Sequence, residues 1–328
     1  MRASSRKMKA VAALVAALSL TAAAGGAGGA GRPYPCFSLQ QAPAWGDGAW
    51  DTLPSAGGFS ALGGGYAPME NQTLFRMGWT KDSLCVKIRC ADAAAKEVQT
   101  RGNGSFWEED SIELFFAVPG TPNLNHLAVN ANGARWMNGT VEGKAAGNWK
   151  AHTTAGMKAW ELELQIPLFL LGRTPKPGEE WRFNITRNRK PPNEYIDRTC
   201  WAPQAKNFGE TETFGSLVFN GRMPAAGERL PLEAEINRDY IQHMTGAING
   251  LHGKYAAYKE NLAGAVNDPA LRPEALSLKQ KWEWVESAQG QDGIGFMALA
   301  AGFAPCEDLD KRTSDLTTRY KMKTLFEQ

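Results

Sequence analysis

An aromatic residue followed by three acids opens the most informative stretch of the chain. Trp107 precedes the acids at 108–110, and the chain then alternates between polar and apolar types until Leu114, Phe115 and Phe116 break the pattern. An aromatic ring stacks on the apolar C–H face of a pyranose, and a carboxylate accepts hydrogen bonds from its hydroxyls. The residue types therefore predict a sugar-binding groove, and an ordinary edge strand with solvated acids is the alternative.

Read with a period of two, this stretch has two different faces. Ile112, Leu114 and Phe116 share one face, while Glu113 and Phe115 share the other. A strand of this kind buries one face in a sandwich and presents the other to a partner. Glu113 is therefore a candidate ligand residue beside Trp107.

A second pair of acids invites a catalytic interpretation. Glu161 and Glu163 stand two residues apart in an alternating run, so on a strand their Cα atoms lie roughly 6.6 Å apart. Carboxylates about 5–9.5 Å apart can act as acid and base or nucleophile in glycoside hydrolases. Catalytic pairs usually come from different elements of a groove, however, so a solvated strand face is favoured over a hydrolase.

Histidine and methionine leave one further alternative, a haem-binding redox sandwich. Met77 or Met137 with His126 or His152 could supply axial ligands. No haem-attachment motif accompanies them. The four histidines are too dispersed for a zinc site or a catalytic triad.

Short alternating runs separated by Gly and Pro extend from about residue 35 to residue 220. This texture is typical of an antiparallel β-sandwich of the jelly-roll or immunoglobulin-like class. The predicted strands are Thr73–Trp79, Ser83–Cys90, Ser111–Val118, His126–Asn130, Trp149–Thr154, Ala159–Ile166, Glu180–Arg187 and Phe214–Phe219.

The chain changes character after Pro231, where apolar residues recur at spacings of three and four. This stripe predicts a helix that Asn267-Asp268-Pro269 ends, then a second around Trp282 and a third over about 308–326. The simplest arrangement is a C-terminal helical hairpin or small bundle. Its apolar stripe predicts core packing, and self-association or a protein partner is the alternative.

The N-terminus has the features of a secretory signal peptide. Basic residues precede a short apolar stretch from Ala10 to Ala24 with small residues at its end, and a Gly/Ala-rich linker follows to Gly31. Roughly 15 apolar residues are too few for a membrane span. We therefore expect export to the periplasm or the extracellular space, with no transmembrane segment.

The net charge and the cysteine count indicate which partners and which compartment to expect. The 328 residues carry a formal charge of only +2, so nothing global attracts nucleic acid. Five cysteines fit an oxidising compartment and leave at least one unpaired.

The predicted divisions of the chain are a signal peptide and linker over 1–31, a β-sandwich over 32–222 and a helical region over 223–328.

Several separated blocks, taken in order, resemble carbohydrate-binding module family 9 and its broader family 9-like group. The resemblance covers about residues 35–220 and leaves the helical region outside. The blocks are Asp82–Ile88, Trp107–Phe116, Val129-Asn130 with Gly133, Trp160–Pro167, Gly178–Arg187, Trp201-Ala-Pro and Phe214–Leu217.

This resemblance implies a non-catalytic jelly-roll-like sandwich in which two aromatic residues clamp a terminal sugar. Trp107 matches the first clamp position and Glu113 a polar position. Phe208 stands at the second clamp position in place of Trp. Ala128 and Ala205 replace an Arg and an Asn of the family pattern. The implied function is that of a secreted carbohydrate-binding protein; a hydrolase or its accessory, a haem protein and a structural envelope protein are the alternatives.

The resemblance also implies a possible structural calcium ion and no required cofactor. Hard oxygen ligands of the kind that calcium prefers lie near several loops, but they form no spaced loop motif. They are Asp82, Asp92, Glu108, Glu109 and Asp110.

Overall fold

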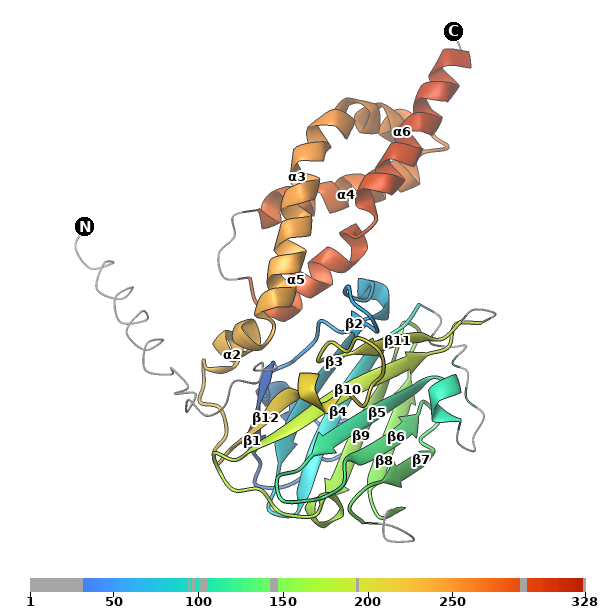
Figure 1. Ribbon diagram of the computed structural model, residues 1–328. Coiled ribbons are helices and arrows are strands. Elements are labelled where there is room, and N and C mark those ends of the chain that lie inside the picture. Colours follow the sequence, from blue (N-terminus) through green and yellow to red (C-terminus); the bar gives the residue numbers. More distant parts are fainter. Residues whose placement is uncertain are drawn as a thin grey trace, which may run out of the picture.

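The computed structural model describes the chain from residue 32 almost to its end. The described residues are 32–93, 95, 98, 100, 105–141, 147–192, 195–289 and 294–326. The leader predicted over 1–31 lies outside them. β-strands occupy the first part of the described chain and helices the second (Figure 1).

The twelve strands found among the described residues form one sheet that folds over into two layers. Its order is β7-β6-β5-β10-β12-β1-β3-β4-β9-β8, with β11 beside β10 and β2 beside β11. The bounds are β1 Pro33–Ser38, β2 Ser60–Ala61, β3 Thr73–Trp79, β4 Ser83–Ala91, β5 Ser111–Ala117, β6 Asn125–Asn130, β7 Arg135–Asn138, β8 Lys150–Ala155, β9 Ala159–Pro167, β10 Glu180–Arg189, β11 Asp197–Cys200 and β12 Gly215–Asn220.

The sheet is mixed, which corrects the expectation of a wholly antiparallel sandwich. The first strand, β1, pairs in parallel with both β12 and β3, whereas the other pairings are antiparallel. Alternation within a strand reports which face is buried and carries no information on the direction of its neighbours. The mainly β class with C-terminal helices is confirmed.

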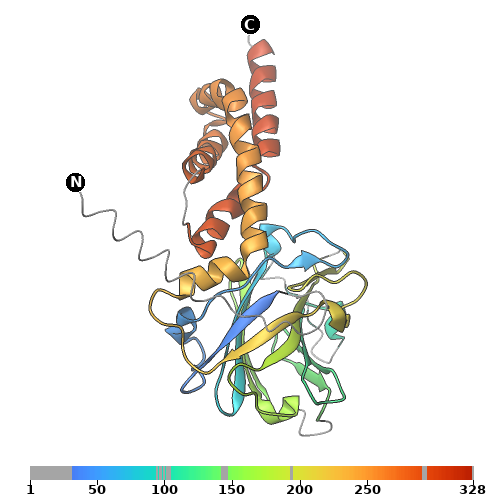
Figure 2. The same cartoon turned by 60° about the vertical axis from the view of Figure 1, so that its left-hand side comes forward.

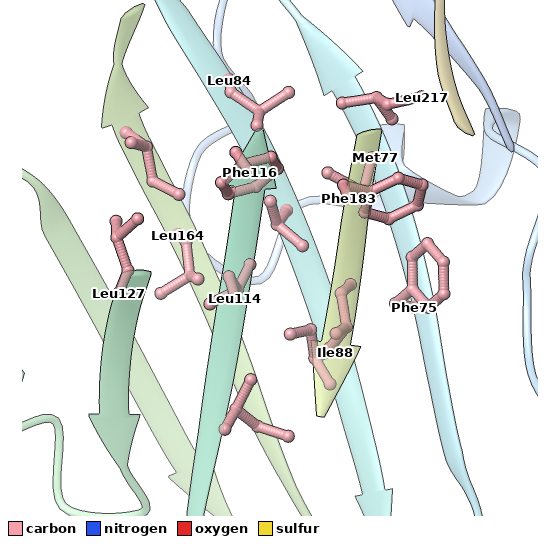
Figure 3. Packing of buried hydrophobic residues seen from close by; sticks show 14 of the residues in the cluster. Phe75, Met77, Leu84, Ile88, Leu114, Phe116, Leu127, Leu164, Phe183 and Leu217 are labelled. Atoms are coloured by element: carbon pink, nitrogen blue, oxygen red, sulfur yellow. The ribbon is translucent and has the colours of Figure 1, made fainter. Parts of the chain in front are cut away.

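The hydrophobic core lies between the two layers. Leu114 and Phe116 of β5 meet Leu164 of β9 and neighbouring apolar side chains of the other layer there (Figure 3). The alternation predicted for β9 is confirmed, since Trp160 and Leu162 are fully buried on the core side. Close packing over so many apolar side chains makes this layer pair a rigid platform for its outer faces.

The C-terminal helices form a small bundle that stands on one end of the sandwich (Figures 1 and 2). The predicted long stripe divides at Asn237 into two helices, and a short apolar helix that the sequence did not indicate precedes the last one. The bounds are α2 Arg229–Ile236, α3 Arg238–Asn267, α4 Arg272–Ala288, α5 Phe296–Phe303 and α6 Leu309–Phe326. Among the described residues, no helix is long and apolar enough to cross a bilayer. Self-association through these helices stays a prediction.

Buried polar side chains join the helical bundle to the sandwich. The Asn237 side chain accepts from the Gly57 amide at 2.8 Å and donates to the Ser55 carbonyl at 2.8 Å. The carboxylate of Glu233 accepts from the Ser55 amide at 2.9 Å. Since buried polar groups are costly unless they are paired, these contacts specify how the bundle sits on the sandwich.

All five cysteines are buried and free of disulfide bonds. Burial raises the pKa of the Cys85 thiol to about 12 and that of Cys200 to about 11. Protonated thiols are poor nucleophiles and poor metal ligands, so these side chains act as small apolar residues of the core.

Candidate functional site

The predicted ligand residue Glu113 lies on the outer face of β5, between the neighbouring strands β6 and β10. Glu113 lies opposite Ala128 of β6 on one side and Thr186 of β10 on the other. Trp136 of β7 lies opposite Ala128 in turn. The small Ala128 side chain therefore separates Glu113 from the Trp136 ring along one row of the sheet.

Glu113 is held by two neighbours and is only 4% exposed. One carboxylate oxygen lies 2.6 Å from His126 Nε2, and the other accepts from Asn188 Nδ2 at 2.7 Å. The His126 ring stacks on Phe115, with centroids 4.1 Å apart. Each carboxylate oxygen retains a second lone pair, so the acid can accept one more hydrogen bond at the exposed side of His126.

Two exposed tryptophans stand at right angles beside this acid. Trp107 is 46% exposed and Trp136 is 36% exposed. Their ring centroids lie 6.5 Å apart with an angle of 84° between the planes. This pair presents a face and an edge to the same corner.

Trp107 is fixed by its neighbours in the chain. It occupies the short 3-10 helix η4, Phe106–Glu108, whose Phe106 is buried. The Ser111 hydroxyl donates to the Phe106 carbonyl, and Asn188 reaches the same carbonyl at 3.5 Å. The Trp107 ring is therefore held over the sheet by residues of β5 and β10.

Phe208 lies in the loop from 201 to 214, which crosses the same outer face. Asn184 of β10 exchanges two hydrogen bonds of 2.9 Å with Ala202 at the start of the loop. Arg182 donates to the Phe214 carbonyl at its end. Phe208 is half-buried, and within the described residues Trp107 makes its aromatic contact with Trp136.

The sequence of this platform matches a known family over more than half of the chain. Residues 44–222 fit the family described as carbohydrate family 9 binding domain-like. The chain belongs to this family. The resemblance noted from the ordered blocks is confirmed, and the family 9 domain accounts for the sheet and its outer face.

Three solved structures are similar to the family 9 domain at low identity. Two are a family 9 module from Caldicellulosiruptor kristjanssonii, with cellotriose (16% identity, 59% of this chain, 96% of that chain, TM-score 0.45) and with glucose (17%, 57%, 96%, 0.44). The third is a suggested carbohydrate-binding protein from Bacteroides uniformis (16%, 58%, 100%, 0.47). No curated protein sequence is significantly similar to this chain.

Other aromatic and acidic candidates have structural positions in the family 9 domain. Trp149 and Trp201 are buried in its core. Asp110 accepts from the Lys190 amide at 3.2 Å. Met77, an alternative haem ligand, is fully buried among apolar side chains.

The possible calcium ligands are not gathered in one place. Within the described residues, no three His, Cys, Asp or Glu side chains form a group able to hold a metal ion. Asp92 forms ion pairs with Arg187 and Arg189, both at 3.0 Å. A structural calcium ion stays a prediction.

The carboxylates considered for hydrolysis lie on the outer face of the other layer. Lys87 lies 3.0 Å from Glu163 and 3.5 Å from Glu161. Glu163 also accepts from the Gly46 amide at 3.0 Å. Each carboxylate therefore has Lys87 as an ion-pair partner, and the two acids share one strand instead of facing each other across a groove.

Asn188 and Arg198 belong to the outer face that carries Glu113, and they were not predicted from the sequence. Asn188 lies opposite Ser111 of β5 on one side and Arg198 of β11 on the other. The polar alternation of Asn184, Thr186 and Asn188 along β10 was the available signal. It places all three side chains on the face of Glu113.

We expect Asn188→Ala to weaken the platform. Asn188 is fully buried and donates to Glu113, to the Ser111 hydroxyl and to the Phe106 carbonyl. Removing a buried partner costs about 1–3 kcal/mol, so urea unfolding should show a loss of that size. A loss below about 0.5 kcal/mol would contradict the role assigned to this side chain.

Proposed function

We propose that this chain is an exported, non-catalytic carbohydrate-binding protein that stacks a sugar ring on Trp107. The observation that carries the proposal is the exposed right-angled pair of Trp107 and Trp136 beside a buried, hydrogen-bonded Glu113. The face of Trp107 would take the apolar face of a pyranose. Export and location in the periplasm or outside the cell rest on the sequence of residues 1–31.

The polar groups beside the tryptophans support sugar recognition. Glu113 is oriented by Asn188 and His126 before any ligand arrives, so little ordering is needed when a hydroxyl binds. Phe208 lies in a loop tied to the same face and would oppose Trp107. Stacking with a few hydrogen bonds typically gives affinities of about −4 to −8 kcal/mol, in the millimolar to micromolar range.

A binding role is better supported than catalysis. The family 9 domain is a binding domain by its description, and Glu161 and Glu163 are both paired with Lys87. The Glu113 carboxylate stands alone in its row between Ala128 and Thr186. A glycoside hydrolase would require a second carboxylate across the groove.

Calorimetry and glycan-array binding test this function. We expect the full chain to bind neutral oligosaccharides, cellotriose among the probes, and Trp107→Ala to weaken binding roughly tenfold or more. Phe169→Ala is the matched control, because Phe169 is 57% exposed but lies in η6, Leu168–Leu171, after β9. If no glycan binds, or if both variants bind like the wild type, the proposal is wrong.

A further inference from the structure

A shallow pocket of about 470 Å³ lies next to the tryptophan corner. It is lined by Glu108, Lys190, Tyr195, Ile196 and Arg198. Glu108 directly follows Trp107 in η4, so one rim of the pocket is the same short helix that carries the stacking ring. A ligand on Trp107 that is longer than one sugar therefore has this pocket as its neighbour.

The pocket adjoins the polar row that holds Glu113. Asn188 of β10 lies between them, since it is paired with Arg198 of β11 and donates to Glu113. Asn188 Oδ1 and Thr186 Oγ1 are buried and have no hydrogen-bond partner within the described residues. Both side chains are fully buried, so this part of the row lies beneath the surface that a ligand would touch.

The pocket carries more cations than the tryptophan corner. Its lining holds two cations and one carboxylate. Glu108 and Lys190 are both engaged in interactions of their own. Asp197, next to Arg198 in β11, is paired with Arg189 at 2.8 Å.

Arg198 is the cation of the pocket that is available to a ligand. Its side chain is exposed, and no carboxylate of the described residues lies within ion-pairing distance of its guanidinium. Arginine is suited to carboxylates because its planar fork donates two parallel hydrogen bonds. Tyr195, 96% exposed at the same rim, adds a flat apolar surface and a hydroxyl.

We propose that the pocket is a second subsite that takes a carboxylate-bearing sugar, a uronic acid unit joined to the sugar on Trp107. This inference rests on the proposed function and names its substrate class. Arg198 would pair with the carboxylate, and Tyr195 would cover the ring. The ligand is then an acidic oligosaccharide of at least two units, with the carboxylate placed to one side of the stacked ring.

Matched trisaccharides test the subsite directly. Cellotriose and β-1,4-linked triglucuronic acid differ only at C6, which carries a hydroxymethyl group in one and a carboxylate in the other. Equivalent neutral and acidic pairs in the galacto and manno series cover other stereochemistry. Calorimetry with the full chain should show about tenfold tighter binding of the acidic member of one pair. Added salt should reduce the preference.

Arg198→Gln should remove the preference without changing the affinity for the neutral trisaccharide. Lys81→Gln is the control, because it removes an exposed cation from the turn between β3 and β4, and it should leave both affinities unchanged. A 6-sulfated trisaccharide that binds in place of the uronate would overturn the carboxylate assignment. Equal binding of neutral and acidic members, or a preference that survives Arg198→Gln, overturns the subsite while the proposed function stands. If neither member of any pair binds, both proposals fail.

Discussion

Arg187→Met is expected to lower the free energy of unfolding by about 3–5 kcal/mol, the range for breaking a buried ion pair. Arg187 is 1% exposed and pairs with Asp92, which is itself 4% exposed, at 3.0 Å. It also donates to the carbonyls of Asn71 and Ala91 at 2.9 and 2.8 Å. Methionine keeps much of the volume but leaves the carboxylate and two carbonyls without this donor.

The measurement is urea unfolding of the full chain, with Arg89→Met as the matched control. Arg89 also extends from a strand, but its ion pair with Glu161 is 3.8 Å long and both side chains are more than a third exposed. Such pairs contribute about 0–1 kcal/mol. Losses of equal size in the two variants would contradict this prediction, because the buried ion pairs of Asp92 would then contribute no more to stability than an exposed ion pair.

Gly58→Ala is expected to disturb the junction between sandwich and helices by about 2–5 kcal/mol. Gly58 has φ of +69°, and a Cβ there would lie 2.7 Å from Cγ of Tyr240. A left-handed conformation costs an alanine about 1–2 kcal/mol, and overpacking adds about 1–3 kcal/mol. Tyr240 is buried in the first turn of α3, so the start of that helix must move.

Gly65→Ala separates the backbone effect from the clash. Gly65 has φ of +77° in the turn after β2, but nothing lies within 4 Å of its added Cβ. It should lose only about 1–2 kcal/mol and keep the bundle docked. Limited proteolysis between residues 221 and 228 reports docking, and we expect faster cleavage in Gly58→Ala alone. Similar cleavage and similar losses would contradict contact between Gly58 and Tyr240.

The strands with strict alternation were predictable, and those without it were not. The bounds of β3 are those expected, and β4 and β9 differ by a residue. β1 was missed because its Pro-Tyr-Pro start reads as a breaker. β7 was missed because its four residues are largely exposed. Parallel pairing of β1 could not be inferred, since direction depends on contacts far apart in the sequence.

The residues of the candidate site likewise fall into those that were predictable from the sequence and those that were not. Trp107 and Glu113 were found from residue type, because an aromatic residue beside acids has recognisable chemistry. Asn188 and Arg198 were not, because their place beside Glu113 depends on the register of β5, β10 and β11. His126 was considered only as a metal ligand until the register of β6 placed it on Phe115 and Glu113.

The position of β1 has a consequence for the order of events in folding. β1, the first strand among the described residues, lies in the middle of the sheet, and its five-residue register is with β12, the last of them. The sheet therefore cannot be completed before residue 220 has been made. Pairings between such distant segments make folding slow. The topology therefore makes completion of the sheet depend on a strand that follows all the others in the sequence.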